Sequence, residues 1–199
     1  MRKSNNILFF DNLSQFDSLI HGFSTRSFGS MRPSHPDIVY SLKKFAAALK
    51  IDSQKIVRMD QVHSNTVYWA TEKDWDHEIE KTDGLLSEEK NVFLGVITAD
   101  CVPVLLYDQK KRYVSAVHAG WRGLYNEIIK EAVSQMIQKE SDPKDILVGI
   151  GPCIRACCYN IPEDRAKMYV EKFPDWRPFI SEREDKLFFD LVGVATNQL

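Results

Sequence analysis

Hydrophobic residues along this chain gather in short continuous runs that polar segments separate. Apolar runs of this length are typical of strands that are buried inside a sheet. The runs at residues 92–97 and 102–107 are expected to be such strands, the first a central strand buried on both faces. Pro103 is tolerated because it stands near the start of its run. Further strands are expected at residues 7–10, 21–26, 67–70, 113–117 and 146–150.

Other segments repeat their apolar residues at the spacing of an amphipathic helix. The clearest spans residues 124–137, and Asp37 caps another over residues 38–49. A third helix has Pro162 at its first position and stops before Pro174, and a fourth includes residues 191–198. Residues 27–36 predict a loop and residues 71–81 an exposed charged segment. The pattern predicts a mixed α/β fold, with buried central strands and covering helices, in a single domain over residues 1–199.

Composition and charge exclude several classes of protein. A net charge of −2 leaves no basic surplus for nucleic acid, and no apolar run is long enough to span a membrane. The basic first residues lack the apolar stretch of a signal peptide. We therefore expect a cytoplasmic protein. Its four cysteines are then thiols rather than disulfides: Cys101, Cys153, Cys157 and Cys158.

Three residues with metal-binding side chains lie at the ends of predicted strands, where α/β proteins usually place their sites. They are His63, Cys101 and His118. Taken singly, each is most often structural, and their spacing matches no local zinc motif. Taken together, two imidazoles and one thiolate suit a catalytic zinc that keeps a fourth position open for an acidified water. Asp100, beside the cysteine, either orients a ligand and moves protons or is a structural carboxylate.

A glycine-bearing turn from Gly120 to Gly123 follows His118 and opens the long predicted helix. Small residues let the backbone approach a ligand, and a helix start presents free N–H groups to an anion such as phosphate. Arg122 adds a cation to this turn. An equally good reading is that the glycines only permit a tight connection between strand and helix.

Six motifs occur in a fixed order from about residue 21 to the C-terminus. They are His21-Gly-Phe-Ser-Thr-Arg26, Gln61-Val-His63, Thr82-Asp-Gly84, Thr98-Ala-Asp-Cys101-Val-Pro-Val, His118-Ala-Gly-Trp-Arg-Gly123 and Gly151-Pro-Cys-Ile154 followed by Cys158-Tyr. This set resembles the YfiH-like laccase-domain family, which was named for polyphenol oxidase activity and later assigned purine nucleoside phosphorylase and adenosine deaminase activities. The resemblance implies a layered α/β fold similar to that of bacterial toxin deamidases. It also implies zinc held by His63, Cys101 and His118.

The chain departs from the family pattern in two places. Asn160 stands where the family usually carries a glutamate, which puts the role of that carboxylate in doubt. The chain also ends at Leu199 inside a predicted helix, whereas family members typically continue through an arginine-rich segment. We therefore expect the chain to lack the family's C-terminal segment, and with it part of the site wall.

The sequence leaves four functions open. It does not determine the oligomeric state. The first is a zinc-dependent enzyme that phosphorolyses adenosine and inosine and deaminates adenosine, with Arg26 and Arg122 as cations for phosphate. The second is a copper-dependent polyphenol oxidase, since two histidines and a cysteine also bind copper, although five histidines are too few for a multicopper centre. The third is a metal-free hydrolase with Cys101 as nucleophile and His118 as base. The fourth is a non-catalytic binding module.

Overall fold

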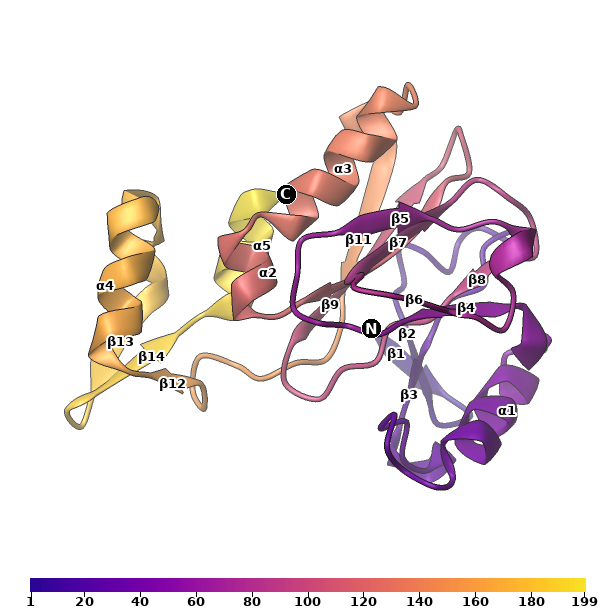
Figure 1. Cartoon of the computed structure of the whole chain (residues 1–199), viewed down its shortest axis with the longest axis horizontal. Helices are drawn as coiled ribbons and strands as arrows, with labels where there is room; N and C mark the ends of the chain where they lie inside the picture. Colours follow the sequence, from indigo (N-terminus) through magenta and orange to yellow (C-terminus); the bar gives the residue numbers. More distant parts are fainter.

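A five-stranded sheet lies at the centre of the computed structural model, which describes all 199 residues (Figure 1). Its strand order is β11-β9-β10-β7-β5. All neighbouring pairs are antiparallel except β5 and β7, which run parallel at one edge. The strands are β5 (Val67–Trp69), β7 (Gly84–Ser87), β9 (Val102–Asp108), β10 (Val114–Ala119) and β11 (Ile146–Ile150). A mixed α/β architecture, as predicted, is therefore confirmed.

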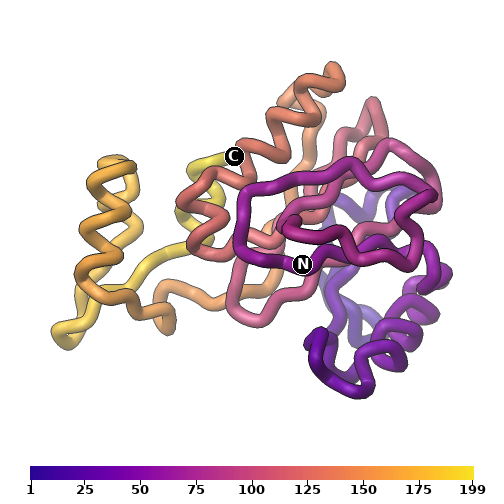
Figure 2. The backbone as a smooth tube through the Cα atoms, viewed as in Figure 1, coloured from indigo at the N-terminus to yellow at the C-terminus, as the bar shows by residue number.

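Both faces of the central sheet are covered, because successive side chains of a strand point to opposite faces. On β9, Val104 and Leu106 belong to the main core, which also contains residues of α2 (Trp121–Tyr125), α3 (Ile128–Gln138) and α5 (Leu191–Gln198). Leu105 and Tyr107 instead pack with a cluster from the N-terminal part of the chain. Figure 2 shows the C-terminal end of the chain returning beside α2 and α3, which α5 contacts.

Three smaller sheets surround this centre. They are β1 (Arg2–Ser4), β2 (Ile7–Phe9) and β3 (Phe23–Ser24); β6 (Glu78–Ile79), β4 (Ile56–Met59) and β8 (Phe93–Leu94); and β12 (Asn160–Ile161), β14 (Lys186–Phe189) and β13 (Ile180–Arg183). Short 3-10 helices occupy Arg26–Phe28, Ser53–Lys55, Glu72–Asp74, Pro143–Asp145 and Pro174–Phe179. No helix has the length and apolar character that crossing a membrane requires.

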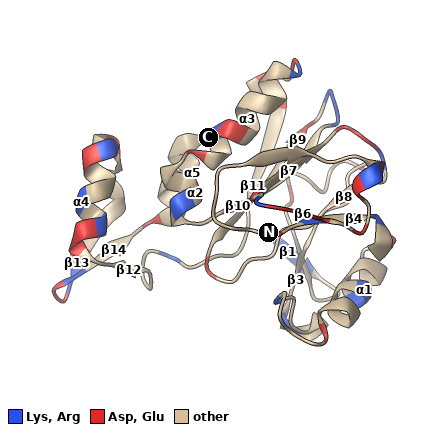
Figure 3. Ribbon diagram, in the orientation of Figure 1, with Lys and Arg blue, Asp and Glu red and all other residues tan.

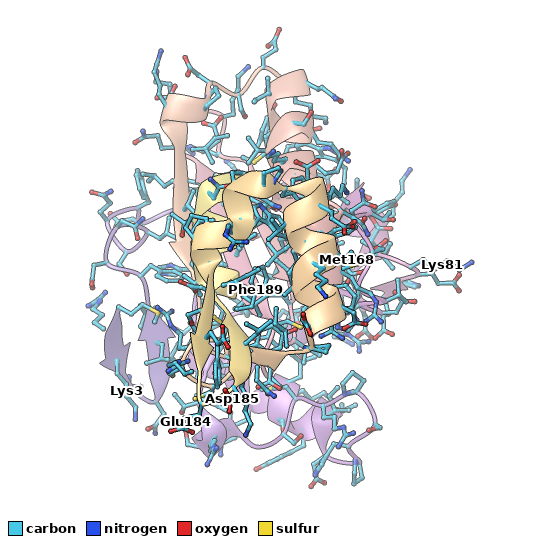
Figure 4. The ribbon with its side chains drawn as sticks, turned by 90° about the vertical axis from the view of Figure 1, so that its left-hand side faces the viewer. Lys3, Lys81, Met168, Glu184, Asp185 and Phe189 are labelled. Atoms are coloured by element: carbon cyan, nitrogen blue, oxygen red, sulfur yellow. The ribbon has the colours of Figure 1, made fainter.

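The C-terminal sheet and α4 (Glu163–Lys172) form the part of the chain that projects at the left of Figure 1. Phe189 of β14 is fully buried and stacks on Tyr169 of α4 with ring centroids 4.5 Å apart. In Figure 4 this phenylalanine lies between the strands and the helix, whereas Glu184 and Asp185 lie at the tip of the hairpin. The aromatic contact attaches α4 to the hairpin and to the main core.

Several local predictions are confirmed by these elements. The strands expected at residues 102–107, 113–117 and 146–150 correspond to β9, β10 and β11, and residues 67–69 form β5. The helix expected over residues 38–49 is α1 (Ile38–Ala48). Pro162 caps α4 rather than occupying its first position. In the segments expected at residues 7–10 and 21–26, only β2 and the two residues of β3 are strand.

The prediction of a central strand at residues 92–97 is wrong. Only Phe93–Leu94 is extended into a strand, and it pairs in parallel with β4 outside the central sheet. The run instead borders a largely apolar cavity of about 1060 Å³ between α1 and one face of the central sheet. A continuous apolar run signals burial, but a central strand also needs backbone partners on both sides, and this run has β4 on one side and borders the cavity.

The prediction of one helix over residues 124–137 is also wrong, because the chain breaks it into α2 and α3. Glu127 between them adopts a left-handed conformation, with φ of 60°. The carbonyl of Leu124 accepts hydrogen bonds from the Glu127 N–H at 2.9 Å and from the buried Gln198 side chain at 2.6 Å. Apolar periodicity continues across the break because both helices pack on the same core, so the pattern alone could not reveal it.

Candidate metal centre

Three side chains that are distant in sequence converge at one end of the central sheet. Ligand atoms of His63, Cys101 and His118 all lie within 4.8 Å of one another. Cys101 directly precedes β9, His118 is near the end of β10, and His63 lies in the loop between β4 and β5. The Cys101 Sγ is 3.8 Å from the His63 Nε2, and the two imidazole rings meet edge to face with centroids 4.9 Å apart. The three side chains that the sequence predicts to lie together at strand ends are therefore close to one another in the structure.

The loop that carries His63 has an unusual backbone. Gln61 and His63 both have positive φ, at 50° and 64°, a conformation that costs a non-glycine residue on the order of 1–3 kcal/mol. The surroundings hold it in place: the Gln61 amide accepts from the Ile97 N–H at 2.8 Å and donates to the Ile97 carbonyl at 2.6 Å. The Gln61 amide thereby takes the place of a neighbouring strand's backbone for Ile97. The same two bonds fix the conformation of the loop just before His63.

Asp83 is a fully buried carboxylate that organises two of the three candidate ligands. Its Oδ1 accepts from the His63 N–H at 2.9 Å and lies 2.8 Å from the His118 Nδ1. Its Oδ2 accepts from the Ser64 N–H at 2.6 Å and from the Ser64 hydroxyl at 2.8 Å. Strand register places it there, because Val117 of β10 lies opposite Gly84 of β7, and the His118 N–H donates to the Asp83 carbonyl at 2.7 Å. A histidine whose Nδ1 is held by a carboxylate presents its Nε2 to a metal.

These contacts set the charges of the cluster. Burial lowers the pKa of His118, but the hydrogen bond to Asp83 and the neighbouring Cys101 outweigh it and raise that pKa to about 9. Burial and then the charge of His118 lower the pKa of His63, which favours its neutral, metal-binding form. Burial raises the pKa of Asp83, yet its hydrogen bonds with His118, Ser64 and His63 hold the pKa below its usual value. A metal that binds here must displace the proton from His118.

Gly120 gives the three side chains room to meet. A Cβ at this position would lie 2.7 Å from the His63 Cδ2 and 3.0 Å from the Cys101 Sγ. No L-residue side chain fits at such distances unless those two groups move apart. Gly120 is therefore needed because the cluster leaves no space for a side chain there, and not only because it permits the turn.

Gly120→Ala is expected to weaken metal binding about tenfold or more, because overpacking at this point separates His63 from Cys101 at a cost of about 1–3 kcal/mol. Zinc affinity, measured by competition with a chromophoric chelator, checks this. Gly95→Ala is a matched control, since its Cβ would also be crowded, at 3.1 Å from the Ile56 Cγ2, but away from the cluster. Unchanged zinc affinity in Gly120→Ala would contradict the assignment of these residues as ligands.

The structure places Asp100 differently from the three converging residues. Its side chain is exposed and makes no hydrogen bond or ion pair, while its carbonyl accepts from the Ile154 N–H at 2.9 Å. The carboxylate that orients a candidate ligand is Asp83. In the sequence, Asp83 stands out only as part of the Thr82-Asp-Gly84 motif, where an acidic residue just before a strand glycine is the signal that points to it.

The two arginines predicted to bind phosphate, Arg26 and Arg122, do not lie together. Arg26 is exposed and lies on the wall of the large cavity, with no bond to the Gly120–Gly123 turn. Arg122 places its guanidinium 4.3 Å from the centre of the Trp121 ring, and Figure 3 shows that α2 carries a basic (blue) segment. Arg165 of α4, which no motif in the sequence singles out, approaches the same ring at 4.5 Å. Neither Arg122 nor Arg165 has a carboxylate partner.

The turn itself opens a shorter helix than predicted, since α2 has five residues and the longer α3 begins at Ile128. The dipole of so short a helix is small, so any anion here depends mainly on the two arginines. The charge of Arg122 lowers the pKa of His63 and, with Arg165, opposes the rise that burial causes in the pKa of Tyr159. The charge of Arg122 thus acts on the candidate ligand His63, whereas Arg165 reaches the Trp121 ring that both arginines share.

Comparison with known proteins assigns the chain to a family. The family model described as multi-copper polyphenol oxidoreductase laccase matches residues 21–199. The chain belongs to this laccase family. Its solved relatives include YfiH of Bacillus licheniformis, with a TM-score of 0.75 and 31% identity over 81% of this chain and 64% of that one. YlmD of Geobacillus stearothermophilus has a TM-score of 0.76 and 27% identity over the same shares.

Relatives within the laccase family carry an enzyme's name. The protein named purine nucleoside phosphorylase YlmD from Bacillus subtilis is 36% identical over 177 residues, which are 78% of this chain and 63% of that protein. A protein of Clostridium acetobutylicum, also named purine nucleoside phosphorylase, is 42% identical over 53% of this chain and 44% of its own length. The chain thus spans 44% to 63% of the length of these two curated relatives. The comparisons support an enzyme of the laccase family.

Proposed function

We propose that this chain carries the mononuclear zinc centre of a purine nucleoside enzyme. The reaction is phosphorolysis of adenosine or inosine to free base and ribose 1-phosphate, with deamination of adenosine as a second activity. The observation that carries the proposal is the convergence of His63, Cys101 and His118 within 4.8 Å around one point. The name shared by the relatives from Bacillus subtilis and Clostridium acetobutylicum supports the substrate class.

The donor set fits zinc. Two imidazoles and a thiolate leave about one net positive charge on the ion and a fourth position free, as in catalytic zinc sites. When bound, zinc supplies a Lewis acid or an acidified water. Asp83 keeps the Nδ1 of His118 occupied and so turns its Nε2 toward the ion. Metal binding uses the thiolate and two neutral imidazoles, so the ion must displace the proton that Asp83 and Cys101 stabilise on His118, while Asp83 continues to orient the ring.

Phosphate requires cations that are not already neutralised. Arg122 and Arg165 meet this condition, because aromatic stacking on Trp121 rather than a carboxylate holds both side chains. Guanidinium groups bind phosphate oxygens through paired hydrogen bonds, and they stabilise the charge that develops as the glycosidic bond breaks. The backbone of Gly120 is a further candidate phosphate ligand in this subsite, and Arg26 is the candidate cation of an alternative subsite on the wall of the large cavity. In the proposed reaction a phosphate oxygen bonds to the anomeric carbon of the ribose, and the purine nitrogen leaves.

The proposal is tested with zinc-loaded protein, inosine or adenosine, and phosphate, with products separated by liquid chromatography. Free base and ribose 1-phosphate are expected, and both disappear on chelation. Arg122→Met and Arg165→Met are each expected to raise the apparent KM for phosphate about tenfold, with little change in the KM for nucleoside, because a charge-assisted hydrogen bond is worth about 1.5–3 kcal/mol. Arg183→Met is the matched control, since Arg183 also stacks on an aromatic ring, at 4.1 Å from the centre of Phe188.

Two outcomes would contradict this proposal in different ways. Equal effects of the arginine variants on both KM values would reject their assignment to phosphate. A larger phosphate effect in Arg26→Ala would move the phosphate subsite to the wall of the large cavity. If zinc-loaded protein releases no base but copper-loaded protein oxidises phenols, the oxidase replaces the nucleoside enzyme.

A copper oxidase built from this chain would hold fewer copper ions than the multi-copper description of the family suggests. Besides His63 and His118, the chain has only His21, His35 and His77. The His21 Nε2 accepts from the Phe10 N–H at 2.9 Å, and the His77 Nδ1 bonds the Trp75 carbonyl at 2.7 Å. The chain's one cluster of three candidate ligands is the cluster described above. Copper chemistry in this chain would therefore use a single ion.

A metal-free hydrolase is the second candidate, and one observation favours it. Asp83, His118 and Cys101 form a carboxylate–imidazole–thiol series, in which Asp83 holds the Nδ1 of His118 and leaves its Nε2 for the thiol. That is the arrangement of a nucleophile, its base and an orienting group. Bound zinc would occupy the thiolate that this chemistry needs. The metal content of the purified protein therefore separates the two proposals.

A further inference from the structure

Cys157 and Cys158 form a second group of thiols, outside the cluster of candidate metal ligands. Both side chains are exposed, and their sulfur atoms lie 3.3 Å apart in the connection between β11 and β12. The turn that carries them is fixed by hydrogen bonds from the Cys158 and Tyr159 N–H groups to the Arg155 carbonyl, at 2.9 and 3.1 Å. Arg183 of β13 also donates to the Ala156 carbonyl at 2.7 Å. Two solvent-facing thiols are thus held side by side on an anchored turn.

Adjacent cysteines are poorly suited to form a disulfide with each other. Consecutive Cα atoms are about 3.8 Å apart, which is shorter than the roughly 4.4–6.8 Å that disulfides usually span. A bridging atom between the two sulfurs removes this difficulty, because it closes a larger ring. The pair is therefore better arranged to chelate one atom than to bond to itself.

The distance between the two sulfur atoms indicates which kind of atom they can bind together. With sulfur–metal bonds of about 2.3 Å, a sulfur separation of 3.3 Å subtends an angle of about 90° at the bound atom. Trivalent arsenic and antimony form pyramidal compounds with bond angles of this size. Tetrahedral zinc needs a wider angle, and two-coordinate Cu(I) needs sulfurs on opposite sides of the ion. Thiolates are also the soft ligands that such elements prefer.

We propose that Cys157 and Cys158 form a bidentate thiol site for trivalent arsenic or antimony compounds. For an organoarsenous acid, each thiol forms one As–S bond and one As–OH bond breaks, so that two molecules of water leave. Arsenic stays trivalent throughout, and no oxidant or reductant takes part. The closeness of Cys157 raises the pKa of Cys158, which keeps a proton on this thiol for the departing water.

Phenylarsine oxide, which hydrates to such an acid, is the probe for this site. The full chain is first loaded with zinc, so that Cys101 is protected if it is a ligand. One equivalent of the probe is expected to bind per chain, seen by intact-protein mass spectrometry, and to block two thiols from alkylation. A dithiol such as dimercaptopropanol is expected to remove it. Cys157→Ser and Cys158→Ser are each expected to weaken binding on the order of 10²-fold or more, the usual gain from two-point attachment.

Cys153→Ser is the matched control, since Cys153 is a half-buried thiol only four residues away and is not part of the pair. It is expected to bind the probe like the unchanged chain. Circular dichroism confirms that the three variants fold. One equivalent of probe retained by the double variant Cys157→Ser Cys158→Ser would overturn the proposal. So would loss of binding in Cys153→Ser alone, or displacement by a monothiol as easily as by the dithiol.

Discussion

Protein purified without added metal is expected to contain about one zinc ion per chain, and Cys101→Ala and His118→Ala are each expected to lose it. Removing either residue leaves two ligands, too few for a stable mononuclear site. The loss in affinity is expected to exceed the roughly 100-fold that changes in the residues around metal ligands can cause. Inductively coupled plasma mass spectrometry of dialysed protein measures the metal content.

Matched control variants show whether the loss of zinc is specific to residues of the cluster. Cys153→Ala removes another half-buried thiol, and His77→Ala removes an exposed imidazole, so both are expected to retain zinc. Zinc retained at full occupancy by Cys101→Ala and His118→Ala would exclude the proposed centre. Metal-free protein in which Cys101 reacts rapidly with acylating reagents would favour the hydrolase. Copper at one ion per chain would instead support the oxidase.

Asp83→Asn is expected to lower the free energy of unfolding of the metal-free protein by about 3–5 kcal/mol, as does breaking a buried charged pair. Asparagine has the same shape, but each carboxylate oxygen of Asp83 accepts hydrogen bonds. An NH₂ group in either place would face the Ser64 donors, or the His63 N–H and the Nδ1 of His118. One pair of donors therefore loses its acceptor whichever way the amide turns.

The same substitution is expected to weaken zinc binding about 10- to 100-fold, because the Nδ1 of His118 loses the carboxylate that orients its ring. Denaturant unfolding of the metal-free protein and zinc titration of the folded variant measure the two effects separately. Asp60→Asn is the control: Asp60 is an exposed carboxylate in the loop that carries His63, and it accepts one hydrogen bond, from the Thr82 N–H at 3.2 Å. An Asp83→Asn protein with unchanged stability and unchanged zinc affinity would remove Asp83 from the centre.

Local pattern was a good guide wherever an element is determined by its own residues. The strands β9, β10 and β11 could be predicted because each is a short, largely apolar run, almost wholly buried in β9 and β10 and partly buried in the edge strand β11. The helix α1 could be predicted from its apolar spacing. In the same way, His63, Cys101 and His118 stood out because chemically active side chains at strand ends are few in this chain. These inferences need only short stretches of sequence.

Other features depend on contacts between segments far apart in the chain, and only the tertiary structure decided them. Residues 92–97 look like a central strand, yet the Gln61 side chain and a cavity take the places of neighbouring strands. The break between α2 and α3 involves Gln198, which bonds the Leu124 carbonyl from 74 residues away. Periodicity within a window carries no information about such partners.

The candidate centre shows the same division. Its three ligand residues were suggested by the sequence, whereas their meeting follows from the register of β10 against β7 and β9. That register also brings Asp83 to His118, and the missing side chain of Gly120 leaves the space in which His63 and Cys101 approach. By itself, the sequence determined which side chains were available for chemistry and which segments would be buried. Non-local strand pairing decided which of them came within bonding distance, because backbone hydrogen bonds between distant strands fix positions that no local pattern encodes.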